Sequence, residues 1–282
     1  MKLAFTTLGC PDWNLETMIS RAVQHGYQGI DFRGYLGEME IYRLPEFSTK
    51  LEETRDRFRE ASLEIPCFSS SVRLFTESTE QREKYLAELK QYADLCEYFG
   101  TPFIRVFGGL IGDREKEEAI TIAAENTAEY LKVFEGLPVT LLLETHDDWT
   151  GCQVVQELLS RVNSPQLEVL WDVHHPYRTI GEEPEQTWNV LGDRIRYTHW
   201  KDSYVKKEHK RGYQLCLLGE GDIPLYRMYR LLKDQGYEGY FTLEWEKVWC
   251  PEIEKPEIAF KQYADFMKQL EQQVSSGPTM KF

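Results

Sequence analysis

Short apolar runs rich in β-branched and aromatic residues alternate with amphipathic stretches along the chain. Such runs are typical of buried strands. They predict strands at residues 3–7, 29–33, 64–70, 103–109, 140–146, 167–173, 195–200 and 240–246. Apolar residues at helical spacing predict helices within 15–23, 86–99, 119–134, 229–236 and 263–270.

This alternation of strand and helix favours a parallel sheet covered by helices. Eight such units in 282 residues fit a single-domain α/β fold, the (β/α)8 TIM barrel, over residues 1–275, with 276–282 as a frayed C-terminal tail. The alternative is a doubly wound open sheet, which would have a glycine-rich G-x-G-x-x-G loop after its first strand. This chain reads TTLGCPDW there. The long, charged stretch 203–222 predicts a loop with structure of its own that could act as a lid.

Composition narrows the class of protein. Hydrophobic residues make up 41% of the chain and aromatic residues 13%, as expected for a folded protein. The net charge of −14 disfavours nucleic acid as a partner, because phosphate binding relies on Lys and Arg. We find no apolar stretch near the ~18 residues of a membrane span and no convincing signal peptide. Six scattered cysteines without a CxxC pair indicate reduced thiols in a cytoplasmic protein. Formation of a homo-oligomer stays open.

Acidic and histidine side chains gather at the ends of four consecutive predicted strands. In a parallel barrel the C-terminal ends of all strands meet at one face, where catalytic groups lie. These ends carry Glu144 and His146, Asp172 with His174 and His175, His199 with Lys201, and Glu244 with Glu246. One such residue is weak evidence, but four neighbouring strands together predict a functional cluster.

The charges in this cluster need compensation. Two like charges ~4 Å apart repel by about 4 kcal/mol at an effective dielectric constant near 20. Glu144, Asp172 and Glu244 must therefore take up protons or share a cation. Carboxylate oxygens with one imidazole, that of His199, suit Mn, Mg, Co or Zn in a site that keeps open positions. The sequence thus predicts one divalent metal ion.

The runs ETH, WDVHH, HWKD and LEWE resemble those of the xylose isomerase-like TIM barrels, the superfamily of sugar phosphate isomerases and epimerases. The resemblance extends from LGCPDW through LEWE and so covers nearly the whole chain. It implies that Glu144, Asp172, His199 and Glu244 bind the metal ion and that His175 contacts substrate. Epimerases of this superfamily have an arginine shortly after the metal-binding histidine, whereas this chain reads KDSYVKK.

The predicted function is that of a metal-dependent isomerase or epimerase acting on a keto sugar or cyclitol. Glu144 and Glu244 would move a proton next to the carbonyl through an enediolate. The predicted substrate contacts, besides His175, are His146, Arg105 and Lys201, with Arg33 as a further pocket residue. Flat apolar surfaces for a sugar ring could come from Trp13, Trp149, Trp200 and Trp245. No glycine-rich phosphate loop occurs, so a phosphorylated substrate is not expected.

Three other functions stay open. A lyase on the same scaffold would dehydrate a keto-inositol or 3-dehydroshikimate, or eliminate from a 3-keto-glycoside. A DNA repair enzyme similar to endonuclease IV would need more histidines and a basic face. A sugar-binding protein without catalysis would need no metal.

Overall fold

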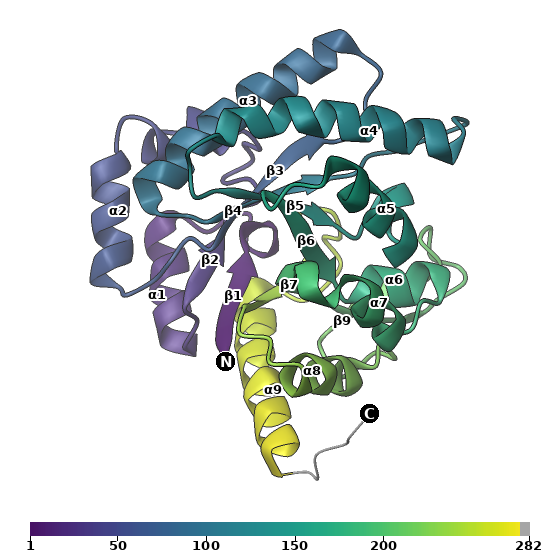
Figure 1. The fold of residues 1–282 in the computed structure, drawn as a ribbon. Helices are drawn as coiled ribbons and strands as arrows, with labels where there is room; N and C mark the ends of the chain where they lie inside the picture. Colours follow the sequence, from purple (N-terminus) through teal and green to yellow (C-terminus); the bar gives the residue numbers. More distant parts are fainter. Residues whose placement is uncertain (277–282) are drawn as a thin grey trace.

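Eight parallel strands form a nearly closed barrel within residues 1–276, the part of the chain that this computed structural model describes (Figure 1). The strands are β1 Lys2–Thr6, β2 Gly29–Asp31, β3 Cys67–Arg73, β4 Phe103–Phe107, β5 Thr140–Glu144, β6 Leu167–Asp172, β7 Ile195–Trp200 and β10 Tyr240–Leu243. Their order in the sheet is β2-β1-β10-β7-β6-β5-β4-β3. Two isolated bridges, Gly29 with Glu64 and Phe32 with Phe68, join the β2 and β3 edges. The predicted TIM barrel is confirmed.

All eight predicted strands are present in the described chain, and one is displaced. The strand expected at 64–70 begins at Cys67 and extends to Arg73. Pro66 precedes it, and a proline has no N–H to donate to a sheet. The strand therefore begins after the proline.

Helices surround the strands as an outer ring (Figure 1). They are α1 Leu15–His25, α2 Leu51–Glu60, α3 Thr79–Phe99, α4 Lys116–Leu131, α5 Cys152–Val162, α6 His174–Ile180, α7 Pro184–Leu191, α8 Leu225–Asp234 and α9 Pro256–Ser276. The sequence predicted α1, α3, α4, α8 and α9 but named none of α2, α5, α6 and α7. Very polar α2 buries only Thr54 and Phe58, which explains its weak signal. Ser276 still belongs to α9, and the rest of the predicted tail, 277–282, lies outside the described residues.

A β-hairpin follows β7 directly. Its strands, β8 Asp202–Val205 and β9 Tyr213–Cys216, pair antiparallel. The Asp202 carboxylate accepts backbone N–H groups from Ser203, Gly219, Gly221 and Ile223, which holds the base of the hairpin. Structure in this segment was predicted; its role as a lid stays a prediction.

The barrel interior is filled below its C-terminal end. Ala4, Cys67, Leu142, Leu170, Tyr197 and Tyr240 form one buried cluster there. They come from six different strands, as expected for side chains that line the inside of a barrel. A second, larger cluster lies between the sheet and the helices. The interior is therefore packed at this level, and the pocket described below lies toward the C-terminal ends of the strands.

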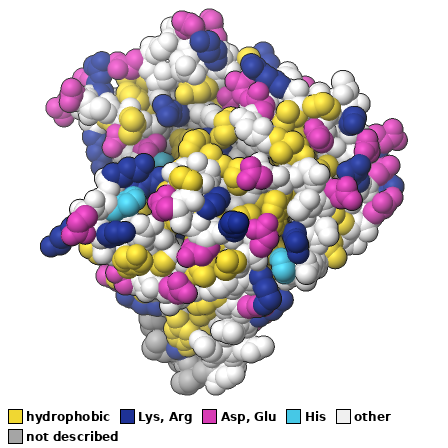
Figure 2. Space-filling model, turned by 180° about the vertical axis from the view of Figure 1, so that it is seen from behind, with side chains coloured by type: hydrophobic (Ala, Val, Ile, Leu, Met, Phe, Trp, Pro, Cys, Tyr) yellow, Lys and Arg dark blue, Asp and Glu magenta, His cyan; other side chains and the backbone are white. Residues whose placement is uncertain are grey.

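Three further observations concern the surface charges, the helices and the cysteines. Acidic and basic side chains are interspersed on the face that Figure 2 shows. Within residues 1–276, every helix is too short or too polar to traverse a bilayer. The six cysteines are free and buried. Two statements stay predictions: that the protein binds no nucleic acid, and that it is cytoplasmic.

Candidate active site

The alternation of side chains along each strand carries the predicted ligands into the barrel. Leu142, Leu170 and Tyr197 belong to the interior cluster. Side chains two residues apart on a strand point to the same face. Two residues further on lie Glu144, Asp172 and His199, each at or near the C-terminal end of its strand.

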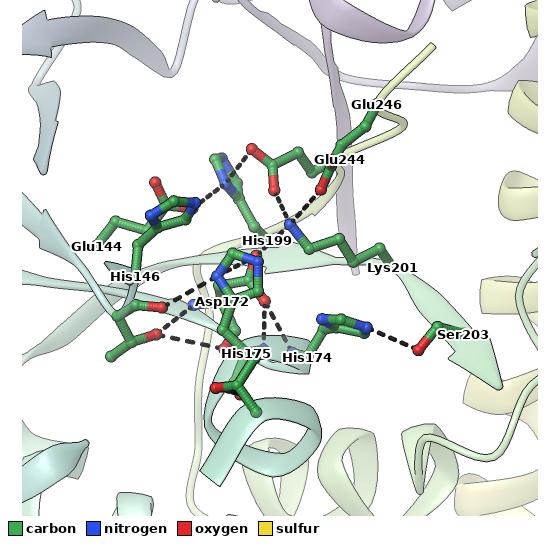
Figure 3. A network of polar contacts seen from close by, with 12 residues as sticks. Glu144, His146, Asp172, His174, His175, His199, Lys201, Ser203, Glu244 and Glu246 are labelled. Carbon is green, nitrogen blue, oxygen red and sulfur yellow. Dashed lines mark hydrogen bonds and ion pairs between the residues drawn. The ribbon is translucent and has the colours of Figure 1, made fainter. Parts of the chain in front are cut away.

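The structure brings together all four side chains predicted to bind metal. One oxygen or nitrogen atom from each of Glu144, Asp172, His199 and Glu244 lies within 4.8 Å of the others. All four side chains are buried (Figure 3). They come from four different strand ends, β5, β6, β7 and β10, as the barrel geometry requires.

The imidazole of His199 lies between carboxylates on both sides. Its Nδ1 is 3.2 Å from Glu144 Oε1 and 3.5 Å from Glu244 Oε1. Its Nε2 is 3.3 Å from Asp31 Oδ2, and Ser69 Oγ donates to the other Asp31 oxygen at 2.8 Å. Sequence reasoning missed Asp31. The sequence signal that could have identified Asp31 is its position at the C-terminal end of β2. Its contact with His199 could not be seen in the sequence, because 168 residues separate the two.

Lys201 is buried among three carboxylates, only 1% exposed. Its Nζ lies 2.9 Å from Asp172 Oδ2 and 3.0 Å from Glu246 Oε1, and it also contacts Glu244 Oε2 (Figure 3). The charge argument from sequence considered only protons or a metal ion as compensation. The structure corrects it, because a lysine of the chain supplies part of that compensation.

Two arginines, Arg105 and Arg211, form ion pairs with glutamates of the site. Arg105 Nε is 3.3 Å from Glu144 Oε2, Arg105 Nη1 donates to the Ser70 carbonyl at 2.9 Å, and the guanidinium lies 3.8 Å from the centre of the Phe107 ring. Arg211 reaches in from the hairpin and donates to Glu246 Oε2 at 2.6 Å. Arg211 thus brings a guanidinium to the site from beyond the KDSYVKK segment.

The pKa values follow from burial and these neighbours. Burial raises the pKa of Asp172 to about 6. Burial also lowers the pKa of Lys201, but Asp172, Glu244 and Glu246 outweigh it and raise that pKa well above its usual value. Burial opposes charge on His199 as well, and the carboxylates around it raise its pKa. Despite burial, Lys201 and His199 hold the pKa of Glu244 well below its ordinary range. The cations Lys201 and His199 and the carboxylates around them therefore stabilise one another's charges at neutral pH.

A pocket of about 520 Å³ opens above this cluster. Glu244 lines it together with Lys201, Arg105, His146 and His175, the four predicted substrate contacts; that they bind substrate stays a prediction. Glu144, Asp172 and His199 lie beneath, with no exposed surface. His146 Nδ1 lies 2.9 Å from Asp147 Oδ1. The pocket size is typical of small-molecule sites.

The tryptophan hypothesis was wrong in its choice of residues. Trp13, Trp149, Trp200 and Trp245 are buried in the core and do not line the pocket. Among the described residues, the tryptophan at the pocket is Trp249, which is 48% exposed. Its place shortly after β10, on the loop at the C-terminal face, is the signal that could have identified it.

The fold and this cluster of side chains define the class of protein. The chain belongs to the xylose isomerase-like TIM barrel family, whose model matches residues 19–270. Fructoselysine 3-epimerase of Escherichia coli O157:H7 is 32% identical over 127 residues, which cover 43% of this chain and 44% of the epimerase. The chain thus spans less than half the length of that curated relative.

Two solved structures share the fold. The probable 3-DHS dehydratase AsbF of Bacillus anthracis superposes with a TM-score of 0.78 at 19% identity, over 95% of this chain and 99% of that one. The IolI protein with a bound zinc atom superposes with a TM-score of 0.77 at 19% identity, over 98% of both chains. Relatives and fold neighbours thus include both epimerases and dehydratases.

Proposed function

We propose that this protein is a divalent-metal-dependent isomerase or epimerase that acts on a keto sugar or cyclitol. The observation that carries the proposal is the buried group Glu144, Asp172, His199 and Glu244 beneath one pocket at the C-terminal end of the barrel. The similarity to fructoselysine 3-epimerase supports it.

The donor atoms fit a metal ion. A histidine that binds metal through one nitrogen usually donates its other N–H to a carboxylate. Asp31 accepts from His199 Nε2 in that manner, which leaves Nδ1 directed at Glu144 and Glu244. Glu144 Oε2 and Asp172 Oδ2 are paired with Arg105 and Lys201, so a metal ion would share these carboxylates with cations of the chain. Three carboxylates and one imidazole match Mn, Mg, Co or Zn, and a fold neighbour binds zinc.

A bound divalent ion would polarise the substrate carbonyl and stabilise the enediolate charge. The side chains would move the protons. Glu244 faces the pocket and can remove the proton from the carbon next to the carbonyl. Glu144 would be the second carboxyl group: in its protonated form it would deliver a proton to the other face for epimerisation or to the neighbouring carbon for isomerisation, while Glu244 keeps the proton that it removed. Lys201, held by Glu244 and Glu246, lies where it can donate to a substrate oxygen. His175 would bind a hydroxyl group, as would His146.

Metal content gives the first test. Elemental mass spectrometry of the purified protein should find close to one divalent ion per chain. Glu244→Gln should lower this content sharply. The matched control is Glu246→Gln, which also loses a partner of Lys201 but lies outside the four ligands. Equal metal content in both variants would contradict the ligand assignment.

Proton transfer gives the second test. With a panel of keto sugars in deuterated water, the product should gain deuterium at the carbon next to the carbonyl. Metal-stripped protein that turns over at the full rate would refute the mechanism. An ultraviolet-absorbing enone product would identify the lyase alternative, and no exchange with any sugar would favour a binding protein.

A further inference from the structure

The pocket contains two arginines near the strands that close the barrel. Arg33 follows β2 and Arg73 is the last residue of β3, the two strands whose edges close the barrel. Both residues line the same pocket as Glu244 and Lys201. The acidic residues that line the pocket instead follow β5 (Asp147) and β10 (Glu244 and Glu246). A substrate in this pocket therefore meets Glu244 and Lys201 after β10 and β7, and Arg33 and Arg73 at β2 and β3.

Arg33 and Arg73 differ from the other cations of the pocket in their partners. Lys201, Arg105 and Arg211 each form an ion pair with a glutamate. No ion pair joins Arg33 or Arg73 to any acidic side chain of residues 1–276.

Arg33 is held in place by neutral groups. Its Nη1 donates to Ser71 Oγ at 3.0 Å, and its guanidinium lies 5.8 Å from the centre of the Phe107 ring. The nearby acid Glu88 instead accepts the backbone N–H of Ser71 at 3.0 Å. Arg33 is half-buried, so water solvates its charge only in part. Such a guanidinium favours an anion as ligand, and its planar fork matches a carboxylate or a phosphate.

We propose that Arg33 and Arg73 bind an anionic group of the substrate, a carboxylate or a phosphate, while its carbonyl end lies at Glu244 and Lys201. The assignment of the carbonyl end depends on the proposed function; the anion site does not. A glycine-rich loop is not required, because arginine side chains alone can hold such a group. The pocket volume of about 520 Å³ accommodates a sugar that carries one.

A binding experiment tests the anion site without turnover. Isothermal titration calorimetry on the metal-stripped full chain would compare three probes: a six-carbon alditol, its 6-phosphate and the corresponding aldonate. We expect one charged probe to bind about tenfold or more tightly than the neutral alditol, since a hydrogen bond to a charged group contributes about 1.5–3 kcal/mol. The charged probe that binds more tightly identifies phosphate or carboxylate as the group.

Variants assign the effect to residues. Arg33→Gln and Arg73→Gln should each reduce the preference for the charged probe, and the double variant should abolish it. Arg43→Gln is the control, because Arg43 is exposed, pairs with Glu40 and does not line the pocket. Circular dichroism would show that the variants fold.

The outcomes separate the two proposals. If the wild type binds all three probes equally, or if the double variant keeps the preference, the anion site is refuted even where deuterium exchange is observed. If the charged probe is preferred but no anionic or neutral keto sugar exchanges deuterium, the anion site stands and the proposed function fails.

Discussion

Lys201→Met is the most informative single substitution, because it removes the one lysine that lies among Asp172, Glu244 and Glu246. Methionine fills a similar volume without charge, so the main change is electrostatic. Removing one partner of a buried ion pair costs about 3–5 kcal/mol, since the remaining charges stay buried and uncompensated. Unfolding entropy is about 2.1 cal/mol/K per residue. For 282 residues, the loss corresponds to a fall in Tm of about 5–8 °C.

Differential scanning calorimetry of metal-stripped protein measures this change. The control is Lys84→Met, because Lys84 pairs with Glu80 on an exposed helix face and its removal should leave Tm nearly unchanged. A divalent ion that binds the four ligands should restore part of the stability of Lys201→Met, by about 2.7 kcal/mol at 100 times its Kd. If Lys201→Met melts with the wild type in the absence of metal, the compensating role of Lys201 is wrong.

Three further substitutions test other parts of the structure. Asp31→Asn should weaken metal binding about 10- to 100-fold in a competition titration, because it loosens the orientation of His199; unchanged affinity would contradict this role. Gly108→Ala should lower the unfolding free energy by about 1–3 kcal/mol in a urea titration, because a Cβ there would overlap the Trp149 ring; wild-type stability would show that the ring can move. Glu88→Gln should stabilise the protein at pH 7 but not near pH 4. Burial raises the pKa of Glu88 above its unfolded value, so the native state favours the protonated form and loses this stability as pH rises; an equal effect at both pH values would contradict the assignment.

Local sequence patterns determined the barrel and the strand ends that form the site. The C-terminal ends of parallel strands meet at one face of a barrel, so Glu144, Asp172 and His199 could be placed near one another without any knowledge of tertiary contacts. Boundaries were less certain where a residue such as Pro66 prevents backbone pairing.

The tertiary structure decided what each of these side chains contacts. Asp31 reaches His199 because the curved sheet directs side chains from the ends of β2 and β7 into the same barrel interior, although β1 and β10 lie between these strands. Lys201 could have been solvated, and its position among carboxylates depends on the packing of three strand ends. Arg33, in contrast, ends without a carboxylate partner. Long side chains can adopt many rotamers, and contacts with residues distant in sequence decide which one is populated. The sequence pattern therefore predicts where charged residues gather but not which of them form ion pairs.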